Sequence, residues 1–280
     1  MKQKWESDLQ LSISNLSFPP ECTTEAYSLL KSLGVGGIEV APTRIGDWEN
    51  LTTAMCAEEA RRLSDFGLVV SSLQAILFKK PSLQLLGAKT EFAELTEHIQ
   101  RVAELGSSLG CKVAVFGAPK NRLRRDLSEA DAFELAVERF SKLSDVCEKL
   151  DFIIVVEPVP EFYGADFLID ASTTSKLVRA VGKPNLGLHL DTGCAYLGED
   201  EIGTAISEGK DILRHFHIAE PKLAEFSHPV SSHKIAAAAL REIGYEQWVA
   251  VEMLTAFDWR AAVAQAVGYS SATYGTFLER

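Results

Sequence analysis

Four side chains that bind hard divalent metal ions stand at the ends of four strand-like segments in the second half of this chain. They are Glu157, Asp191, His217 and Glu252. Each ends a short run of apolar, β-branched or aromatic residues, and each precedes a loop. Three carboxylates and one imidazole suit one divalent metal ion, with Mn²⁺ favoured and Mg²⁺, Co²⁺ or Zn²⁺ as alternatives. We therefore predict that the four strands stand side by side and that their carboxyl ends converge on a single ion.

This ligand set also predicts a type of reaction. A metal ion bound by two adjacent oxygens of a sugar polarises its carbonyl group and acidifies the neighbouring C–H bond. Two carboxylates on opposite sides of the substrate can then take a proton from one carbon and return it to another. We assign this acid/base work to Glu157 and Glu252, and we expect Asp191 and His217 to act mainly as ligands. A lone acidic residue at a strand end is more often a solvated charge or a helix cap, so the prediction depends on all four residues together.

Strand and helix patterns alternate along the whole sequence and predict how these residues are positioned. Strands are expected at 11–15, 36–41, 68–74, 112–117, 152–157, 186–191, 213–218 and 247–253. Helices are expected at 23–33, 54–66, 91–109, 128–150, 172–181, 200–209, 231–243 and 259–278. Eight strand–helix units with no linker between them indicate one domain over residues 1–280, a (β/α)8 TIM barrel.

The main alternative fold is a doubly wound open sheet, which usually shows a glycine-rich turn directly after a strand. The nearest match, at residues 34–37, precedes a strand instead and is typical of a helix end followed by a turn. In a barrel, active sites lie at the carboxyl ends of the strands, where all four predicted ligands are placed. Since side chains two apart on a strand share a face, His189 and His215 are expected to point into the barrel beneath the metal.

Composition limits the partners of the protein. The chain has 280 residues and a formal net charge of −11, which disfavours nucleic acid because proteins that bind it present a basic face. There is no signal-peptide pattern and no apolar run long enough to span a membrane, and the five cysteines are scattered. We expect a cytoplasmic protein with a small-molecule sugar as its substrate and with neither nucleic acid nor membrane as a partner.

Several motifs resemble those of a known family. They are VVEP at 155–158, LHLDTG at 188–193, HFHIAEP at 215–221 and VEM at 251–253. With these motifs the chain resembles the sugar phosphate isomerase/epimerase family of the xylose isomerase-like TIM barrel superfamily, which also contains ketose epimerases, inosose dehydratase and endonuclease IV. The resemblance implies a metal site and acid/base residues at the four positions named above. It also implies a homo-oligomer, because relatives often form dimers or tetramers.

Three positions depart from the ketose epimerase pattern. Those enzymes usually carry a histidine, an arginine and a glutamate where this chain has Cys194, Leu223 and Tyr163. The missing residues help to hold a free ketose, so the departures point away from tagatose- or psicose-type activity and leave the metal ligands intact.

Further residues are predicted to bind the substrate because of their positions near strand ends. They are Glu39, Gln74, His189, Tyr163 and His233. A basic run after the fourth predicted strand has two interpretations. Its members are Lys120, Arg122, Arg124 and Arg125. The run either anchors a phosphate or carboxylate, or it consists of solvated charges that pair with nearby acids at the start of the next helix.

The leading functional prediction is a metal-dependent isomerase or epimerase of a small sugar, keto-sugar or sugar phosphate, acting through an enediolate. A lyase that dehydrates a keto-inositol or keto-sugar, or cleaves a C-glycosidic bond, would use the same base and metal. An endonuclease IV-like phosphodiesterase is a minor alternative, opposed by the acidic charge. A sugar-binding barrel without catalysis would not need the paired carboxylates.

Overall fold

Eight parallel strands form a closed barrel in the computed structural model, which describes residues 10–275. The strands are β1 (Leu11–Ser14), β2 (Gly37–Val40), β3 (Val69–Leu73), β4 (Val113–Phe116), β5 (Ile153–Val156), β6 (Leu186–Asp191), β7 (Leu213–Ala219) and β8 (Val249–Glu252). Each strand pairs with the next one in the sequence, and β8 pairs with β1 to close the ring. The predicted TIM barrel is therefore confirmed, and the open doubly wound sheet is excluded.

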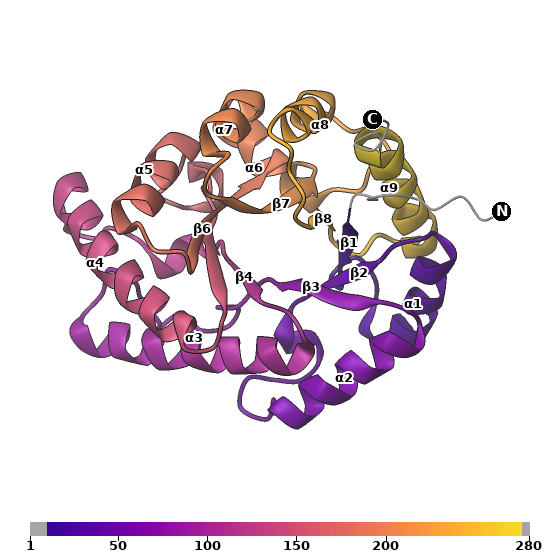
Figure 1. The fold of residues 1–280 in the computed structure, drawn as a ribbon, viewed down its shortest axis with the longest axis horizontal. Coiled ribbons are helices and arrows are strands. Elements are labelled where there is room, and N and C mark those ends of the chain that lie inside the picture. Colours follow the sequence, from indigo (N-terminus) through magenta and orange to yellow (C-terminus); the bar gives the residue numbers. More distant parts are fainter. Residues whose placement is uncertain (1–9, 276–280) are drawn as a thin grey trace.

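Helices surround the barrel on its outside (Figure 1). Those found in the described residues are α1 (Thr23–Ser32), α2 (Thr53–Asp65), α3 (Lys89–Leu109), α4 (Glu129–Glu148), α5 (Ala171–Val181), α6 (Thr192–Gly198), α7 (Ile202–Gly209), α8 (His233–Glu242) and α9 (Trp259–Tyr274). Short 3-10 helices follow several strands, at Pro42–Arg44, Pro119–Asn121, Glu161–Tyr163 and Pro221–Leu223. The last residues of the final predicted helix, 276–278, lie outside the described residues.

Local sequence explains why these helices form and face the barrel. In α3, Leu95, Ile99 and Val102 recur every three or four residues and are buried against the strands. The helix ends at Gly110, whose φ of 80° is a left-handed conformation that glycine adopts without strain. The Thr52 side chain caps the start of α2 by accepting a hydrogen bond from the backbone of Met55.

Helix α6 is the one α-helix that the sequence interpretation omitted. It begins directly after β6, and Asp191 is its N-cap, with Oδ1 accepting a hydrogen bond from the Cys194 backbone N–H at 2.6 Å. One carboxylate oxygen of Asp191 is thereby fixed by the helix, and the other is left free to point elsewhere. The sequence placed a loop here because a helix of seven residues shows too little periodicity to be recognised.

The interior of the barrel is polar as well as closed. Side chains that are buried there include Ser12, Ser14, Glu39, Ser72, His189 and His215. The helix-facing sides of the same strands carry apolar residues such as Leu188, Leu190 and Phe216. The register places His189 beside His215 and Asp191 beside His217. Polar side chains therefore alternate along β6 and β7 toward the carboxyl ends of these two strands. Within residues 10–275, no helix is long and apolar enough to cross a membrane.

Candidate metal centre

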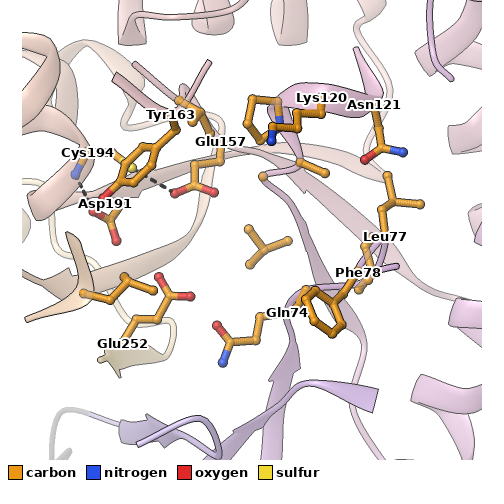
Figure 2. Close-up of a pocket in the computed structure, with 18 of the residues that line it drawn as sticks. Gln74, Leu77, Phe78, Lys120, Asn121, Glu157, Tyr163, Asp191, Cys194 and Glu252 are labelled. Atoms are coloured by element: carbon orange, nitrogen blue, oxygen red, sulfur yellow. Dashed lines mark hydrogen bonds between the residues drawn. The ribbon is translucent and has the colours of Figure 1, made fainter. Parts of the chain in front are cut away.

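A cavity of about 760 Å³ opens at the carboxyl ends of the strands. Its lining includes all four predicted ligands, Glu157, Asp191, His217 and Glu252 (Figure 2). Asp191 and Glu252 are the last residues of β6 and β8, and Glu157 is the first residue after β5. The volume falls within the range of roughly 300–1,000 Å³ typical of ligand pockets. Strands that are consecutive in sequence are neighbours in the barrel, and this adjacency brings together residues that lie far apart in the chain.

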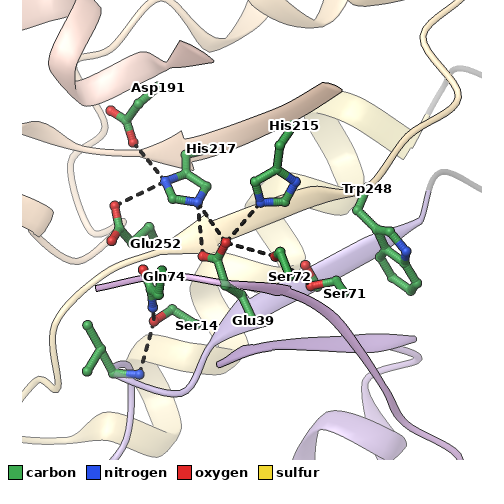
Figure 3. Close-up of polar contacts among 12 residues, drawn as sticks. Ser14, Glu39, Ser71, Ser72, Gln74, Asp191, His215, His217, Trp248 and Glu252 are labelled. Carbon is green, nitrogen blue, oxygen red and sulfur yellow. Dashed lines mark hydrogen bonds and ion pairs between the residues drawn. The ribbon is translucent and has the colours of Figure 1, made fainter. Parts of the chain in front are cut away.

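His217 stands at the centre of this group (Figure 3). Its Nδ1 atom lies 3.5 Å from Asp191 Oδ2 and 3.2 Å from Glu252 Oε2. Its Nε2 atom lies on the opposite side of the ring, 2.9 Å from Glu39 Oε2. The imidazole therefore joins two carboxylates that line the cavity to a third one beneath them.

Glu39 supports His217 from inside the barrel. Its side chain is fully buried, and it accepts hydrogen bonds from Ser72 Oγ at 2.8 Å and from His215 Nε2 at 2.9 Å in addition to His217. With Nε2 of His217 donating to Glu39, a neutral imidazole presents the lone pair of Nδ1 to the cavity. Metal-binding histidines are commonly oriented by a carboxylate in this way.

Charges in this network shift the pKa values of both partners. Burial opposes ionisation of Glu39, but the charge of His217 and hydrogen bonds from His215 and His217 hold its pKa well below the usual value. Burial likewise opposes protonation of His217, yet the carboxylates of Glu39 and Glu252 raise its pKa well above the usual value. Without a metal, the ring of His217 therefore keeps a proton, which a cation bound at Nδ1 would displace.

The two predicted acid/base residues have raised pKa values. Burial, together with the charges of Asp191 and Glu252, raises the pKa of Glu157 to about 8. Burial is also the largest cause of the raised pKa of Glu252, and the nearby His217 partly offsets it. Gly117 allows Glu157 to occupy its place, because a Cβ atom at residue 117 would lie 1.8 Å from Glu157 Oε2.

Buried atoms without hydrogen-bond partners show that this site suits a cation. They include both ring nitrogens of His189, and Asp191 Oδ2, which has only the 3.5 Å contact with His217 Nδ1. Burying a polar atom without a partner costs roughly 1–3 kcal/mol, so several of them in one place indicate a ligand. Potential ligand atoms of Glu157, His189, Asp191 and His217 lie within 4.8 Å of one another. This compact set contains His189 and not the predicted ligand Glu252, whose Oε2 lies 3.2 Å from His217 Nδ1. A mixed set of oxygen and nitrogen donors fits a divalent metal ion.

The predicted substrate-binding residues divide into two groups. Gln74 and Tyr163 line the cavity, where Gln74 donates a hydrogen bond to Ser14 and the Tyr163 hydroxyl accepts one from the Lys222 backbone at 3.0 Å. Glu39 and His189 lie below the cavity, inside the barrel, and are not among its described lining residues.

His233 is likewise not among the described lining residues of the cavity. Its Nε2 donates to Glu220 Oε1 at 2.5 Å, and its Nδ1 lies 2.9 Å from the Tyr274 hydroxyl. This buried network holds the start of α8 against β7 and α9. Glu39, His189 and His233 therefore lie outside the described lining of the cavity, and their contact with a substrate stays a prediction.

Residues that the sequence interpretation did not assign also line the cavity. Cys194 places its Sγ 3.5 Å from Glu157 Oε1, and burial followed by the nearby carboxylates raises its thiol pKa well above the usual value. The loop after β3 contributes Lys79 and Lys80. In the sequence, only the position of Cys194 three residues after Asp191 indicates that its thiol lies near the site. The two lysines resemble ordinary loop charges.

Comparisons with known proteins agree with this geometry. The family model for xylose isomerase-like TIM barrels matches residues 27–270. The fold is similar to a D-psicose 3-epimerase crystallised in the presence of D-fructose, with a TM-score of 0.81, 18% identity, and coverage of 95% of this chain and 100% of that one. No curated protein sequence matches this chain.

Two further structures extend the likeness. A D-psicose 3-epimerase with D-tagatose from Clostridium cellulolyticum H10 has a TM-score of 0.81 and 14% identity, with 95% of this chain and 99% of that one covered. A 3-keto-D-glucoside 4-epimerase from E. coli, in its apo form, has a TM-score of 0.79 and 16% identity, with 94% and 99% covered. At these identities the likeness concerns the fold, and all three proteins are sugar epimerases.

Proposed function

We propose that this chain, which belongs to the xylose isomerase-like TIM barrel family, is a metal-dependent isomerase or epimerase that moves a proton next to the carbonyl group of a small sugar or sugar derivative. The observation that carries the proposal is the convergence of two cavity-lining carboxylates, Asp191 and Glu252, on Nδ1 of His217, with Glu157 beside them. A sugar-binding barrel without catalysis would have no need for this arrangement.

Glu157 and Glu252 are the proposed acid/base pair. They reach the cavity from different strands, and Figure 2 shows both carboxyl groups facing the same space. Without a metal ion the pKa of Glu157 is raised to about 8. A bound cation would lower this pKa and favour the ionised carboxylate, which is the form that acts as a base. Either carboxylate can take the proton from the carbon beside the carbonyl. In an epimerase the other carboxylate returns a proton to the opposite face of the same carbon, and in an isomerase the proton returns to the former carbonyl carbon.

Asp191 and His217 are proposed to hold the metal ion together with the two glutamates. A divalent cation bound there would polarise the carbonyl group of the substrate and stabilise the negative charge that develops on its oxygen. Glu39 keeps Nδ1 of His217 directed at the cavity, and the N-terminus of α6 keeps one oxygen of Asp191 in place. Gln74 and Tyr163, on the cavity wall, are proposed to hydrogen-bond sugar hydroxyls.

A lyase reaction would begin with removal of the same proton, followed by loss of a β-hydroxyl group as water. The two outcomes differ in product mass, because isomerisation conserves mass and dehydration removes one water molecule. Exchange of substrate C–H hydrogen with solvent detects the shared first step in either case.

The experiment has two parts. Elemental analysis of the purified protein is expected to find one divalent metal ion per chain, lost in the Glu157→Gln/Glu252→Gln double variant. A panel of keto-sugars in D₂O is then expected to show metal-dependent deuterium incorporation beside the carbonyl by NMR and mass spectrometry.

The control variant is Glu161→Gln, which removes an exposed carboxylate from the same loop as Glu157. It should retain both the metal and the exchange activity. Absence of metal after reloading with each candidate ion, or unchanged metal content in the double variant, would contradict the proposal.

A further inference from the structure

A further imidazole lies beside the candidate metal centre, one layer deeper in the barrel. His189 is on β6, two residues before Asp191, and its side chain is fully buried. Since alternate residues of a strand point to the same face, His189 and Asp191 share the inner face of β6. His189 is not among the described lining residues of the cavity, so it lies beneath the cavity floor.

His189 differs from every other buried histidine in residues 10–275, because neither of its ring nitrogens has a hydrogen-bond partner. The other four each form at least one hydrogen bond through a ring nitrogen, and they are His98, His215, His217 and His233. Burying a polar atom without a partner destabilises a folded protein. The imidazole of His189 is therefore suited to bind a ligand, and an apolar side chain would fill the same place more favourably if packing were its only role.

The residues around His189 pair with one another instead of with its ring. The ring centroid of His189 lies 4.1 Å from that of His217 and 5.3 Å from that of His215. Both neighbours direct Nε2 to Glu39, which also accepts a hydrogen bond from Ser72 (Figure 3). Glu39 thus pairs with the two neighbouring imidazoles, whereas His189 packs against their rings without a polar partner.

His189 also lies within reach of the proposed metal ligands. One potential ligand atom from each of Glu157, His189, Asp191 and His217 lies within 4.8 Å of the other three. A metal ion holds nitrogen and oxygen ligands at roughly 2.0–2.2 Å, so two ligands on opposite sides of one ion lie about 4.0–4.4 Å apart. The four side chains therefore need only small movements to share one ion.

We propose that His189 is a ligand of the metal ion, together with His217, Asp191 and Glu157. The inference rests on the proposed metal centre and adds to it a residue from inside the barrel. An ion bound by His189 would pair with a buried nitrogen that has no partner among the described residues. Glu252 lies outside this compact set, so its carboxylate is available for the proposed proton transfer while the other four residues hold the ion.

Two imidazoles among the ligands change which ions the centre prefers. Imidazole suits Zn²⁺ and several other transition metals, whereas carboxylates, carbonyls and water suit Mg²⁺. A centre with two imidazoles and two carboxylates discriminates against Mg²⁺ more strongly than one with a single imidazole and three carboxylates. The set that contains His189 therefore favours Zn²⁺ or Co²⁺ over Mg²⁺.

The first test counts the imidazoles bound to the ion. Pulsed EPR of the full-length protein loaded with one equivalent of Cu²⁺ detects them, because the remote ring nitrogen of each bound imidazole modulates the electron spin echo. Two bound imidazoles are expected in the wild type and one in His189→Leu. His189→Gln repeats the count with a polar side chain, should the leucine impair folding. A single bound imidazole in the wild type, or two in a folded variant, would overturn the inference.

The second test combines Zn²⁺ affinity with stability. Competition with a chelator should show an affinity at least about tenfold lower in His189→Leu, since loss of a residue that only supports a ligand already lowers metal affinity by about 10–100-fold. Without metal, this variant should melt at an equal or higher temperature than the wild type, because it removes two buried polar atoms that have no partners. Unchanged Zn²⁺ affinity with a lower melting temperature would make His189 a core residue only.

The matched control is His98→Gln. It replaces another buried imidazole, on α3 outside the barrel, and keeps a side-chain N–H for the backbone oxygen of Ile76. This variant should keep two bound imidazoles and the Zn²⁺ affinity of the wild type.

The outcomes also separate this inference from the proposed function. Two bound imidazoles would support the role of His189 even if no keto-sugar exchanged deuterium. Deuterium exchange by a protein with a single bound imidazole would support the proton transfer and overturn the role of His189. A wild type that binds no ion would overturn both.

Discussion

The two halves of the barrel contribute different parts of the candidate site. Strands β5 to β8 supply the residues proposed to touch the metal, whereas β1 to β4 supply the buried side chains and loops that hold them. Glu39 on β2 orients His217 on β7, and Arg122 after β4 fixes the backbone of Glu157 after β5. Supports from the first half of the ring thus hold ligand residues of the second half. A residue can therefore matter to this site without lining the cavity.

Loss of a direct ligand should have the largest effect. His217→Gln removes the imidazole that the other ligands surround, and it leaves the carboxylates of Asp191 and Glu252 facing each other without a positive charge between them. We expect metal content below detection by elemental analysis and no deuterium exchange, with the barrel still folded by circular dichroism. A metal content equal to that of the wild type would remove His217 from the proposed centre.

Loss of a support from the other half should have the next largest effect. Glu39→Gln weakens the acceptor that holds Nε2 of His217, and loss of such a partner typically costs about 10–100-fold in metal affinity or activity. Metal affinity measured by competition with a chelator should fall accordingly. Ser72→Ala is the matched control, because it removes only one hydrogen bond to Glu39 and should change the affinity much less.

Gly117→Ala tests a contact between the two halves of the barrel, because residue 117 follows β4 and lies against Glu157, which follows β5. An added Cβ atom would displace the flexible end of Glu157 and little else, so we expect a clear loss of metal affinity with a small change in melting temperature. Gly268→Ala, on α9 with open space around it, should leave the metal affinity unchanged and raise the melting temperature slightly, because alanine favours a helix. Equal affinities for Gly117→Ala and the wild type would show that Glu157 does not need its present position.

The pH dependence tests the raised pKa of Glu157. A metal ion competes with the proton on this carboxyl, so metal affinity should rise with pH up to about 8 and level off above it. At a pH between the usual pKa of a glutamate and about 8, Glu157 of the metal-free protein is protonated in the folded state and ionised in the unfolded state. Stability without metal should therefore fall as pH rises through this window.

Thermal denaturation of the metal-free protein from pH 5 to pH 9 measures this dependence. The slope should be smaller in Glu157→Gln, which cannot ionise. An identical slope in the variant and the wild type would assign the dependence to other groups.

Much of the fold could be predicted because its signals are local. All eight strands were predicted, and each lies within a residue or two of its expected bounds, since every strand is a short apolar run between helices with clear ends. Helix α6 was missed because its seven residues carry no repeat, and its first residue directly follows the strand that ends with Asp191. The four residues proposed to bind the metal were found by their shared position at strand ends, which is also a local property.

Other parts of the site could not be found in this way. Glu39 was predicted to contact the substrate, and the structure places it under His217, because the direction of its side chain depends on partners more than 170 residues away. Arg122 and Lys120 are two residues apart, yet one is fully buried and the other lines the cavity. The sequence of the basic run does not indicate which of its side chains is buried.

The sequence alone therefore determined the barrel and the end of it that carries the chemistry, because periodicity and strand ends are properties of neighbouring residues. Tertiary structure decided which polar groups touch one another. Closing the ring brought Glu39 under His217 and Arg122 against the backbone of Glu157, and these contacts fix the orientation of an imidazole and the position of a carboxylate. Orientation and position arise from packing across the barrel, which no stretch of the chain encodes by itself.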